Sequence, residues 1–170
     1  LSNGPYFNGG LDPAGDGDHL IHFGMEYRSA VYGHMGLLGL DSLLPSGCCL
    51  PGYPALPMNQ DIADQAHAQD AVVIGAHPLT TDMSGFLNGT LDWPYSGLGR
   101  EFPAMALLGG IDAIDIASYS NYDDGAVRDL WFDLLNLGLR IPLSVGTDAS
   151  VNRIFDRPAG GHRVYVQCPS

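Results

Sequence analysis

The sequence contains no lysine, and its seven basic residues, all arginines, stand against 19 acidic ones. The resulting net charge of −12 at pH 7 repels phosphate backbones and argues against nucleic-acid binding through a basic patch. Glutamate is scarce too, because only Glu26 and Glu101 accompany 17 aspartates. An acidic surface of this kind suits an extracytoplasmic or secreted setting, or carboxylates that surround cations.

Cysteine and long apolar runs are also scarce. The three cysteines, Cys48, Cys49 and Cys168, form neither a Cys-x-x-Cys zinc pair nor an even-numbered disulfide framework, and we interpret them as isolated thiols. No apolar run approaches the ~20 residues that a membrane-spanning helix needs. With 45% apolar residues, the chain has the composition of a globular domain.

The chain is short for a complete α/β barrel, which takes roughly 250 residues. We expect one partial domain over residues 1–170, with loop-rich stretches at 1–18, 41–59 and 80–99. Because the sequence starts without methionine and without a signal peptide, we expect an upstream segment or a partner chain to complete the fold.

Three segments have the pattern of helices. Residues 61–69 begin with Asp61, which we expect to cap the helix N-terminus. Residues 100–108 end at a pair of glycines. Residues 124–137 end before Gly138 and carry an apolar stripe at helical spacing. The stripe consists of Val127, Leu130, Trp131, Leu134 and Leu135.

Strands are expected at residues 20–27, 35–40, 71–75, 111–117, 141–145 and 163–167. The run at 71–75 is continuously apolar, which is typical of a strand buried on both faces. Strands and helices alternate in the second half of the chain, and this order predicts a parallel α/β sheet, open or closed into a barrel.

Candidate metal ligands follow the predicted strands. Functional groups of parallel α/β folds gather beyond the carboxyl ends of the strands, and His77 and Asp148 come directly after two of them. Glu26 ends an apolar stretch eight residues before His34. Two imidazoles and two carboxylates suit one or two zinc, manganese or iron ions. Two such ions can share a hydroxide, which is a strong nucleophile at neutral pH.

Each of the four residues also has a structural interpretation. His77 precedes a proline and can close a turn, whereas Asp148 can cap a following turn. His34 can be a buried histidine with satisfied hydrogen bonds, and Glu26 can form an ion pair. The candidate partners of Glu26 are Arg28 and Arg163. In a metal site, the ring nitrogen of each histidine that does not bind the metal donates a hydrogen bond, often to a carboxylate. The candidate acceptors are Asp82, Asp112 and Asp115.

Five segments occur in an order that resembles a known enzyme family. They are GMEYRSAVYGHMGLLGL from residue 24, GAHP from residue 75, GGIDAIDIASYS from residue 109, WFDLLNLGLRIPLSVGTDAS from residue 131 and GGHRVYV from residue 160. Together they cover roughly residues 18–167 and resemble the CehA/McbA-type metallohydrolases, a branch of the polymerase-and-histidinol-phosphatase (PHP) superfamily.

The resemblance implies a distorted (β/α)7-type barrel, incomplete in this chain, with a metal site at its carboxyl-terminal rim. Glu26 is similar to the metal-bridging carboxylate of the family, and the other implied ligands are His34, His77 and Asp148. The implied activity is hydrolysis of a phosphoester, carbamate or carboxylic ester in a small molecule by a metal-bound hydroxide. The implied catalytic residues are Glu26, His77 and Asp148, with Tyr119 and Arg163 as candidate substrate contacts.

The sequence departs from the family in three places. The opening His-x-His pair is absent, and His19 and His22 have the wrong spacing and position to replace it. Ser150 stands where many superfamily members carry a histidine. His162 stands where family members often have asparagine, so it is either a variant of the site or a plain surface residue, and we favour the surface residue.

Two other functions stay open. A domain that lacks the first metal-binding pair can serve as a non-catalytic structural or binding component of a larger assembly, with its loops as partner surfaces. A metal-free sugar-binding domain is compatible with the aromatic loop residues Trp93 and Tyr95.

Overall fold

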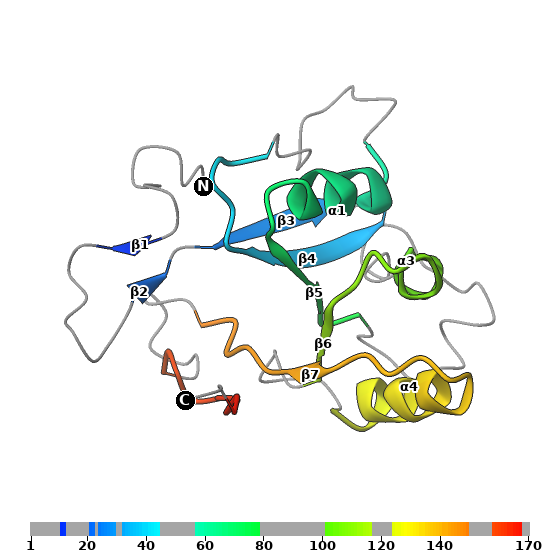
Figure 1. The fold of residues 1–170 in the computed structure, drawn as a ribbon. Helices are drawn as coiled ribbons and strands as arrows, with labels where there is room; N and C mark the ends of the chain where they lie inside the picture. The colour runs from blue at the N-terminus through cyan, green and yellow to red at the C-terminus, as the bar shows by residue number, and fades with distance from the viewer. Residues whose placement is uncertain are drawn as a thin grey trace.

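A computed structural model describes residues 11–12, 21–22, 24–29, 32–44, 57–78, 101–116, 124–149 and 158–167. Within them the chain forms a mixed α/β fold, in which three helices accompany an open sheet of five strands (Figure 1). The loop-rich stretches predicted at 1–18, 41–59 and 80–99 lie largely outside the described residues. Among the described helices, none has the length and apolar character needed to cross a bilayer.

The five-stranded sheet has the order β3-β4-β5-β6-β7. Its strands are Met25–Ser29 (β3), Gly33–Leu38 (β4), Val72–Ala76 (β5), Ala113–Asp115 (β6) and Leu143–Ser144 (β7). Strands β3, β4 and β5 pair antiparallel, whereas β5, β6 and β7 run parallel. A separate small sheet pairs β1 (Leu11–Asp12) with β2 (Ile21–His22).

The prediction of a parallel sheet is therefore right only for the second half of the sheet. A parallel connection needs a crossover of about a dozen residues or more. The link between β3 and β4 is far shorter than that, so these two strands form an antiparallel hairpin.

The prediction of a strand at residues 163–167 is wrong. Its consecutive apolar residues Val164, Tyr165 and Val166 are exposed, and no strand of the described chain pairs with them. A favourable strand composition stabilises a strand only where a neighbour and a buried face exist.

The three predicted helices are present as α1 (Asn59–His67), α3 (Phe102–Leu108) and α4 (Asp124–Asn136). Helix α3 ends at Gly109, whose φ of 76° is the left-handed conformation expected of a glycine after a helix. Helix α4 buries Val127, Leu130 and Leu134 of its predicted stripe. It is tied to the start of β7 because Trp131 Nε1 donates to the Ile141 carbonyl at 2.9 Å.

Asp61 does not cap α1, which is a correction to the sequence prediction. The helix begins at Asn59, and Asp61 lies inside its first turn. Glu101, next to α3, supplies the cap, since its carboxylate accepts the backbone N–H of Asn59 at 2.7 Å and of Gln60 at 3.3 Å. A charge-assisted contact between distant segments thus fixes the start of α1.

One face of the sheet is covered by helices and carries the core. Its buried side chains on β3 and β4 include Tyr27, Met35 and Leu37, which join Ile62 of α1 in one apolar cluster. Gly75 of β5 lies on the same face, because a Cβ there would collide with the ring of Phe102 on α3. The close approach of α3 to the sheet therefore requires glycine at this position.

The opposite face of the sheet is less covered. Val72 is 45% exposed and Ile74 is half-buried, so the prediction that residues 71–75 are buried on both faces is wrong. We call this second surface the open face; it carries Glu26, His34, Ile74 and Ala76. The candidate site lies here.

Candidate metal centre

Glu26 on β3 and His34 on β4 are neighbours on the open face. In the β3–β4 register Glu26 lies opposite Gly36, and His34 lies opposite Arg28. Glu26 and His34 are therefore diagonal cross-strand neighbours, within reach of each other's side chains. Because Gly36 has no side chain, the imidazole of His34 can occupy the space beside Glu26.

His77 reaches the open face because its backbone leaves the strand. Strand alternation would place the residue after Ala76 on the helix-covered face. His77 instead has a φ of 31°, a conformation that non-glycine residues rarely adopt, and its ring contacts Glu26. Backbone strain of this kind costs about 1–3 kcal/mol and is found mainly at functional sites.

Both imidazoles approach the same carboxylate oxygen. His34 Nδ1 lies 3.1 Å and His77 Nε2 lies 3.7 Å from Glu26 Oε1. The two rings meet edge to face, with centroids 5.0 Å apart and an interplanar angle of 74°. Around a tetrahedral zinc ion with bonds of about 2.0–2.2 Å, ligand atoms lie about 3.3–3.6 Å apart. The three side chains have nearly this spacing, with one ligand atom of each within 4.8 Å of the others.

Each imidazole has one buried nitrogen without a hydrogen-bond partner among the described residues. His77 is only 8% exposed, and its Nδ1 has no hydrogen-bond partner among the described residues. His34 Nδ1 is buried as well, and its short contact with Glu26 lacks the alignment of a hydrogen bond. Buried polar groups of proteins are nearly always paired. The interpretation of His34 as a histidine that pairs within the protein is compatible with its 3.1 Å contact with Glu26.

The charges around Glu26 favour its ionised form. Burial alone would raise the pKa of this carboxyl, but the contacts with His34 and His77 and the positive charge of Arg28 outweigh burial and hold the pKa well below its usual range. Arg28 Nε lies 3.8 Å from Oε2, on the exposed side of the carboxylate. Glu26 thus pairs with Arg28 through one oxygen and faces the imidazoles with the other.

Asp148 lies at the expected edge of the sheet but outside this ligand group. Strands β5 and β7 are parallel with β6 between them, so His77 and Asp148 do follow the carboxyl ends of near-adjacent parallel strands. Asp148 is exposed and has a φ of 48°. Burial and the negative charge of Glu26 raise the pKa of Asp148. The structure brings Glu26, His34 and His77 together and leaves Asp148 nearby.

Asp115 and His162 also lie near the site, and the sequence did not identify either of them as a metal ligand or a catalytic residue. Asp115 ends β6 and is 7% exposed; burial raises the pKa of its carboxyl to about 6, although Gly146, His77 and His162 act in the opposite direction. His162 is half-buried rather than a plain surface residue, and its Nδ1 lies 3.1 Å from the Gly146 carbonyl. The strand was predicted to run from 111 to 117, so the strand-end rule passed over Asp115, which the sequence suggested only as a candidate acceptor for the non-ligating ring nitrogen of a metal-binding histidine.

The remaining candidates lie elsewhere. Asp112 accepts the Val73 N–H at 2.7 Å and contacts His67, so it does not hold a ligand of this site. Arg163 is exposed and donates to the Gly160 carbonyl at 2.9 Å. The other candidates lie outside the described residues: Tyr119, Asp82, Trp93 and Tyr95.

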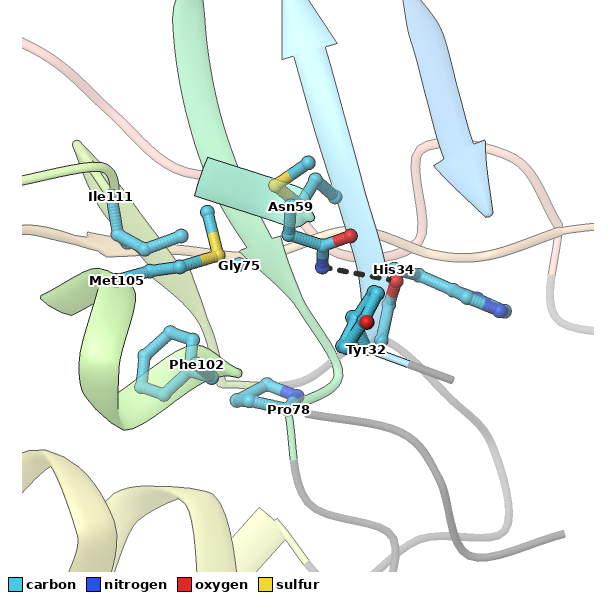
Figure 2. Close-up of a pocket in the computed structure, with 10 residues that line it drawn as sticks. Tyr32, His34, Asn59, Gly75, Pro78, Phe102, Met105 and Ile111 are labelled. Atoms are coloured by element: carbon cyan, nitrogen blue, oxygen red, sulfur yellow. Dashed lines mark hydrogen bonds between the residues drawn. The ribbon is translucent and has the colours of Figure 1, made fainter. Parts of the chain in front are cut away.

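A small cavity lies behind the site and does not hold a substrate. It is lined by Phe102, Met105 and Ile111 on the helix side, and Asn59 closes it by donating to the Gly33 carbonyl at 3.2 Å. Figure 2 shows the imidazole of His34 pointing away from these apolar side chains. The cavity measures about 10 Å³, enough for roughly one water molecule.

Comparison of the chain with protein-family models, with curated proteins and with solved structures gave no match. The fold and the geometry of Glu26, His34 and His77 are therefore the observations from which a function must be argued.

Proposed function

We propose that the protein is a metal-dependent hydrolase that acts on an ester-type bond of a small molecule: a phosphoester, a carbamate or a carboxylic ester. The observation that carries the proposal is the approach of His34 Nδ1 and His77 Nε2 to one oxygen of Glu26. The resemblance to the CehA/McbA-type metallohydrolases supports it. In this proposal the open sheet is part of a distorted PHP barrel, which an upstream segment or a partner chain completes.

The donor set fits a divalent transition-metal ion. Two histidines and one carboxylate are found in catalytic zinc sites, where a fourth position is left for water or substrate. The same set on one face of an ion is typical of non-haem iron, and manganese accepts it as well. When bound, the ion supplies a water molecule activated at neutral pH and polarises the bond to be broken. We propose one ion for these three residues and one or two ions in the intact domain.

The surrounding residues supply orientation and charge. Glu26 would hold the ion with Oε1 while Arg28 stays beside Oε2, at the exposed side where an anionic substrate group can approach. Asp148 remains the proposed fourth ligand, which requires residues 145–149 to move it inward.

The test is metal-dependent hydrolysis by the full chain. After chelation, zinc, manganese or iron(II) is restored, and release of p-nitrophenol is followed from an acetate, a carbamate and a phosphodiester. We expect metal-dependent turnover of at least one substrate, and His77→Ala should lower both zinc affinity and turnover by more than about 100-fold, more than the 10- to 100-fold effect of lost second-shell contacts. Secondary structure should be retained in the variant.

His67→Ala is the matched control, because His67 is a half-buried histidine on α1 that contacts Asp112 instead of the site. Its zinc affinity and turnover should match the wild type. Tight zinc binding without turnover of any substrate would overturn the hydrolase proposal in favour of a non-catalytic binding component. Equal effects of both substitutions would contradict the metal centre itself.

A further inference from the structure

Asp115 belongs to the open face, as the strand registers show. Ile74 lies opposite Ala113 and Gly75 opposite Ile114, so the next residues along β5 and β6, Ala76 and Asp115, are level with each other. Ala76 in turn lies opposite His34. Residues that are level across a sheet point to the same side. Asp115 therefore shares a face with His34 and Glu26, and His77 follows the small residue between them.

His77 and Asp115 each lack the partner that the other can supply. His77 directs Nε2 towards Glu26, so Nδ1 is the nitrogen left over. Nδ1 is buried and has no hydrogen bond to any described residue, and His77 is 8% exposed. Asp115 Oδ1 is likewise buried without a hydrogen bond to the described part of the chain, and Asp115 is 7% exposed. An imidazole N–H and a carboxylate oxygen are complementary, and leaving either one buried alone costs about 1–3 kcal/mol or more.

Gly146, which follows β7, fixes the other side of the Asp115 carboxylate. A Cβ at residue 146 would lie 2.9 Å from Asp115 Oδ2, and the Gly146 backbone acts to lower the pKa of the carboxyl. The same Cβ would lie 3.8 Å from Oδ1, so Gly146 packs against Oδ2 more closely than against Oδ1. The positive form of His77 lowers the pKa of Asp115, so the two groups lie within electrostatic reach of each other.

We propose that Asp115 is a positioning residue for His77: its Oδ1 accepts the Nδ1–H of the imidazole and so fixes the tautomer that presents the Nε2 lone pair beside Glu26. The proposal rests on the metal centre proposed above, and it adds the residue that selects the binding form of His77. Carboxylates that hold the outer nitrogen of a ligating histidine orient the ring and raise its basicity. No hydrogen bond joins the two atoms in this structure, so the bond requires rotation of the ring or of the carboxylate.

The test measures the tautomer of His77 directly. The full chain is labelled with ¹⁵N at histidine, and the His77 ring signals, assigned by their loss in His77→Gln, are recorded with and without zinc. In the wild type we expect a proton on Nδ1 in both samples. Asp115→Ala should convert His77 to a mixture or to the Nε2–H form and weaken zinc binding by about 10- to 100-fold. Asp115→Asn keeps an acceptor oxygen, so it should retain the tautomer and lose less affinity.

Asp112→Asn is the matched control, because Asp112 lies at the other end of the same strand and contacts His67. This substitution should move the His67 signals and leave those of His77 unchanged. If Asp115→Ala weakens zinc binding but leaves the His77 tautomer unchanged, Asp115 is itself a metal ligand and the proposal is overturned. If Asp115→Ala does not fold, the Asp115→Asn variant still tests the proposal. Loss of the Nδ1–H form of His77 in Asp115→Asn would contradict it.

The two proposals fail differently. Absence of zinc binding in the wild type would overturn the metal centre, yet the tautomer in the zinc-free protein would still show whether Asp115 holds His77. If the wild type binds zinc but the His77 tautomer does not change when Asp115 is substituted, only the inference about Asp115 is overturned.

Discussion

The two ends of β6 place similar residues in opposite situations. Before the strand, Asp112 contacts His67 Nε2 at 2.9 Å and also accepts the Val73 N–H, so the pair is satisfied and joins α1 to the sheet. At the other end, Asp115 and His77 are far more buried, and each keeps a polar atom without a partner. Since buried polar groups are normally satisfied, the unsatisfied end marks where a ligand or a proton must be accommodated. An aspartate–histidine pair whose polar atoms all have hydrogen-bond partners is structural, whereas a buried pair with unpaired polar atoms is a candidate for ligand binding or catalysis.

The largest effect is expected on zinc binding. Here Glu26 at the candidate site is compared with Glu101, which caps a helix. Glu26→Gln should remove measurable zinc binding in isothermal titration calorimetry, because the neutral amide no longer offers a charged oxygen between the imidazoles. Glu101→Gln should bind zinc within about twofold of the wild type, since Glu101 contacts the backbone of α1 instead. Retained binding in Glu26→Gln would contradict the assignment of Glu26 as a ligand.

A pH series sharpens the difference at Asp115. Folding raises the pKa of this carboxyl from 3.8 to about 6, so the folded protein holds its proton more tightly than the unfolded chain does. The free energy of unfolding of the wild type should therefore fall as the pH rises from about 4 through about 6. Relative to the wild type, Asp115→Asn should gain up to about 3 kcal/mol over this range, from the ~1.4 kcal/mol that each pKa unit represents.

This series is measured by urea unfolding at constant ionic strength, in the presence of a chelator so that metal binding does not enter. A difference between Asp115→Asn and the wild type that stays constant from pH 4 to pH 7 would show that Asp115 titrates alike in the folded and unfolded states.

A smaller effect is expected from the helix cap. Glu101→Gln should lower the free energy of unfolding by about 1–2 kcal/mol, because the buried carboxylate caps the first N–H groups of α1 and an amide oxygen accepts them more weakly. Urea unfolding at pH 7 measures this loss. Asp61→Asn is the control, and it should change stability by less than about 0.5 kcal/mol, since Asp61 is exposed and does not cap the helix.

Local sequence patterns predicted the elements whose causes are local. Helix α4 follows from its apolar spacing, and α3 ends where Gly109 permits a left-handed residue. The cap of α1 was not predictable in this way, because it comes from Glu101, 42 residues further along the chain than Asn59. The antiparallel hairpin of β3 and β4 was missed because strand order alone was considered, without the length of the connection.

The candidate site was predictable to the extent that it follows the ends of strands. The strand-end rule selected His77, whereas Asp115 lay inside the strand predicted at 111–117 and was named only as a candidate acceptor for the non-ligating ring nitrogen of a metal-binding histidine. The convergence of His77 with Glu26 was not predictable from alternation, because it depends on the positive φ of His77. The position of Asp148 outside the group depends on the path of the chain after β7, which has no sequence signal.

The most direct measurement is a crystal structure of the full chain with zinc, in which anomalous scattering locates the ion. We expect a peak on the open face, about 2.0–2.2 Å from Glu26 Oε1, His34 Nδ1 and His77 Nε2. A peak only at the satisfied pair of His67 and Asp112, or none within bonding distance of Glu26, His34 and His77, would contradict the metal centre.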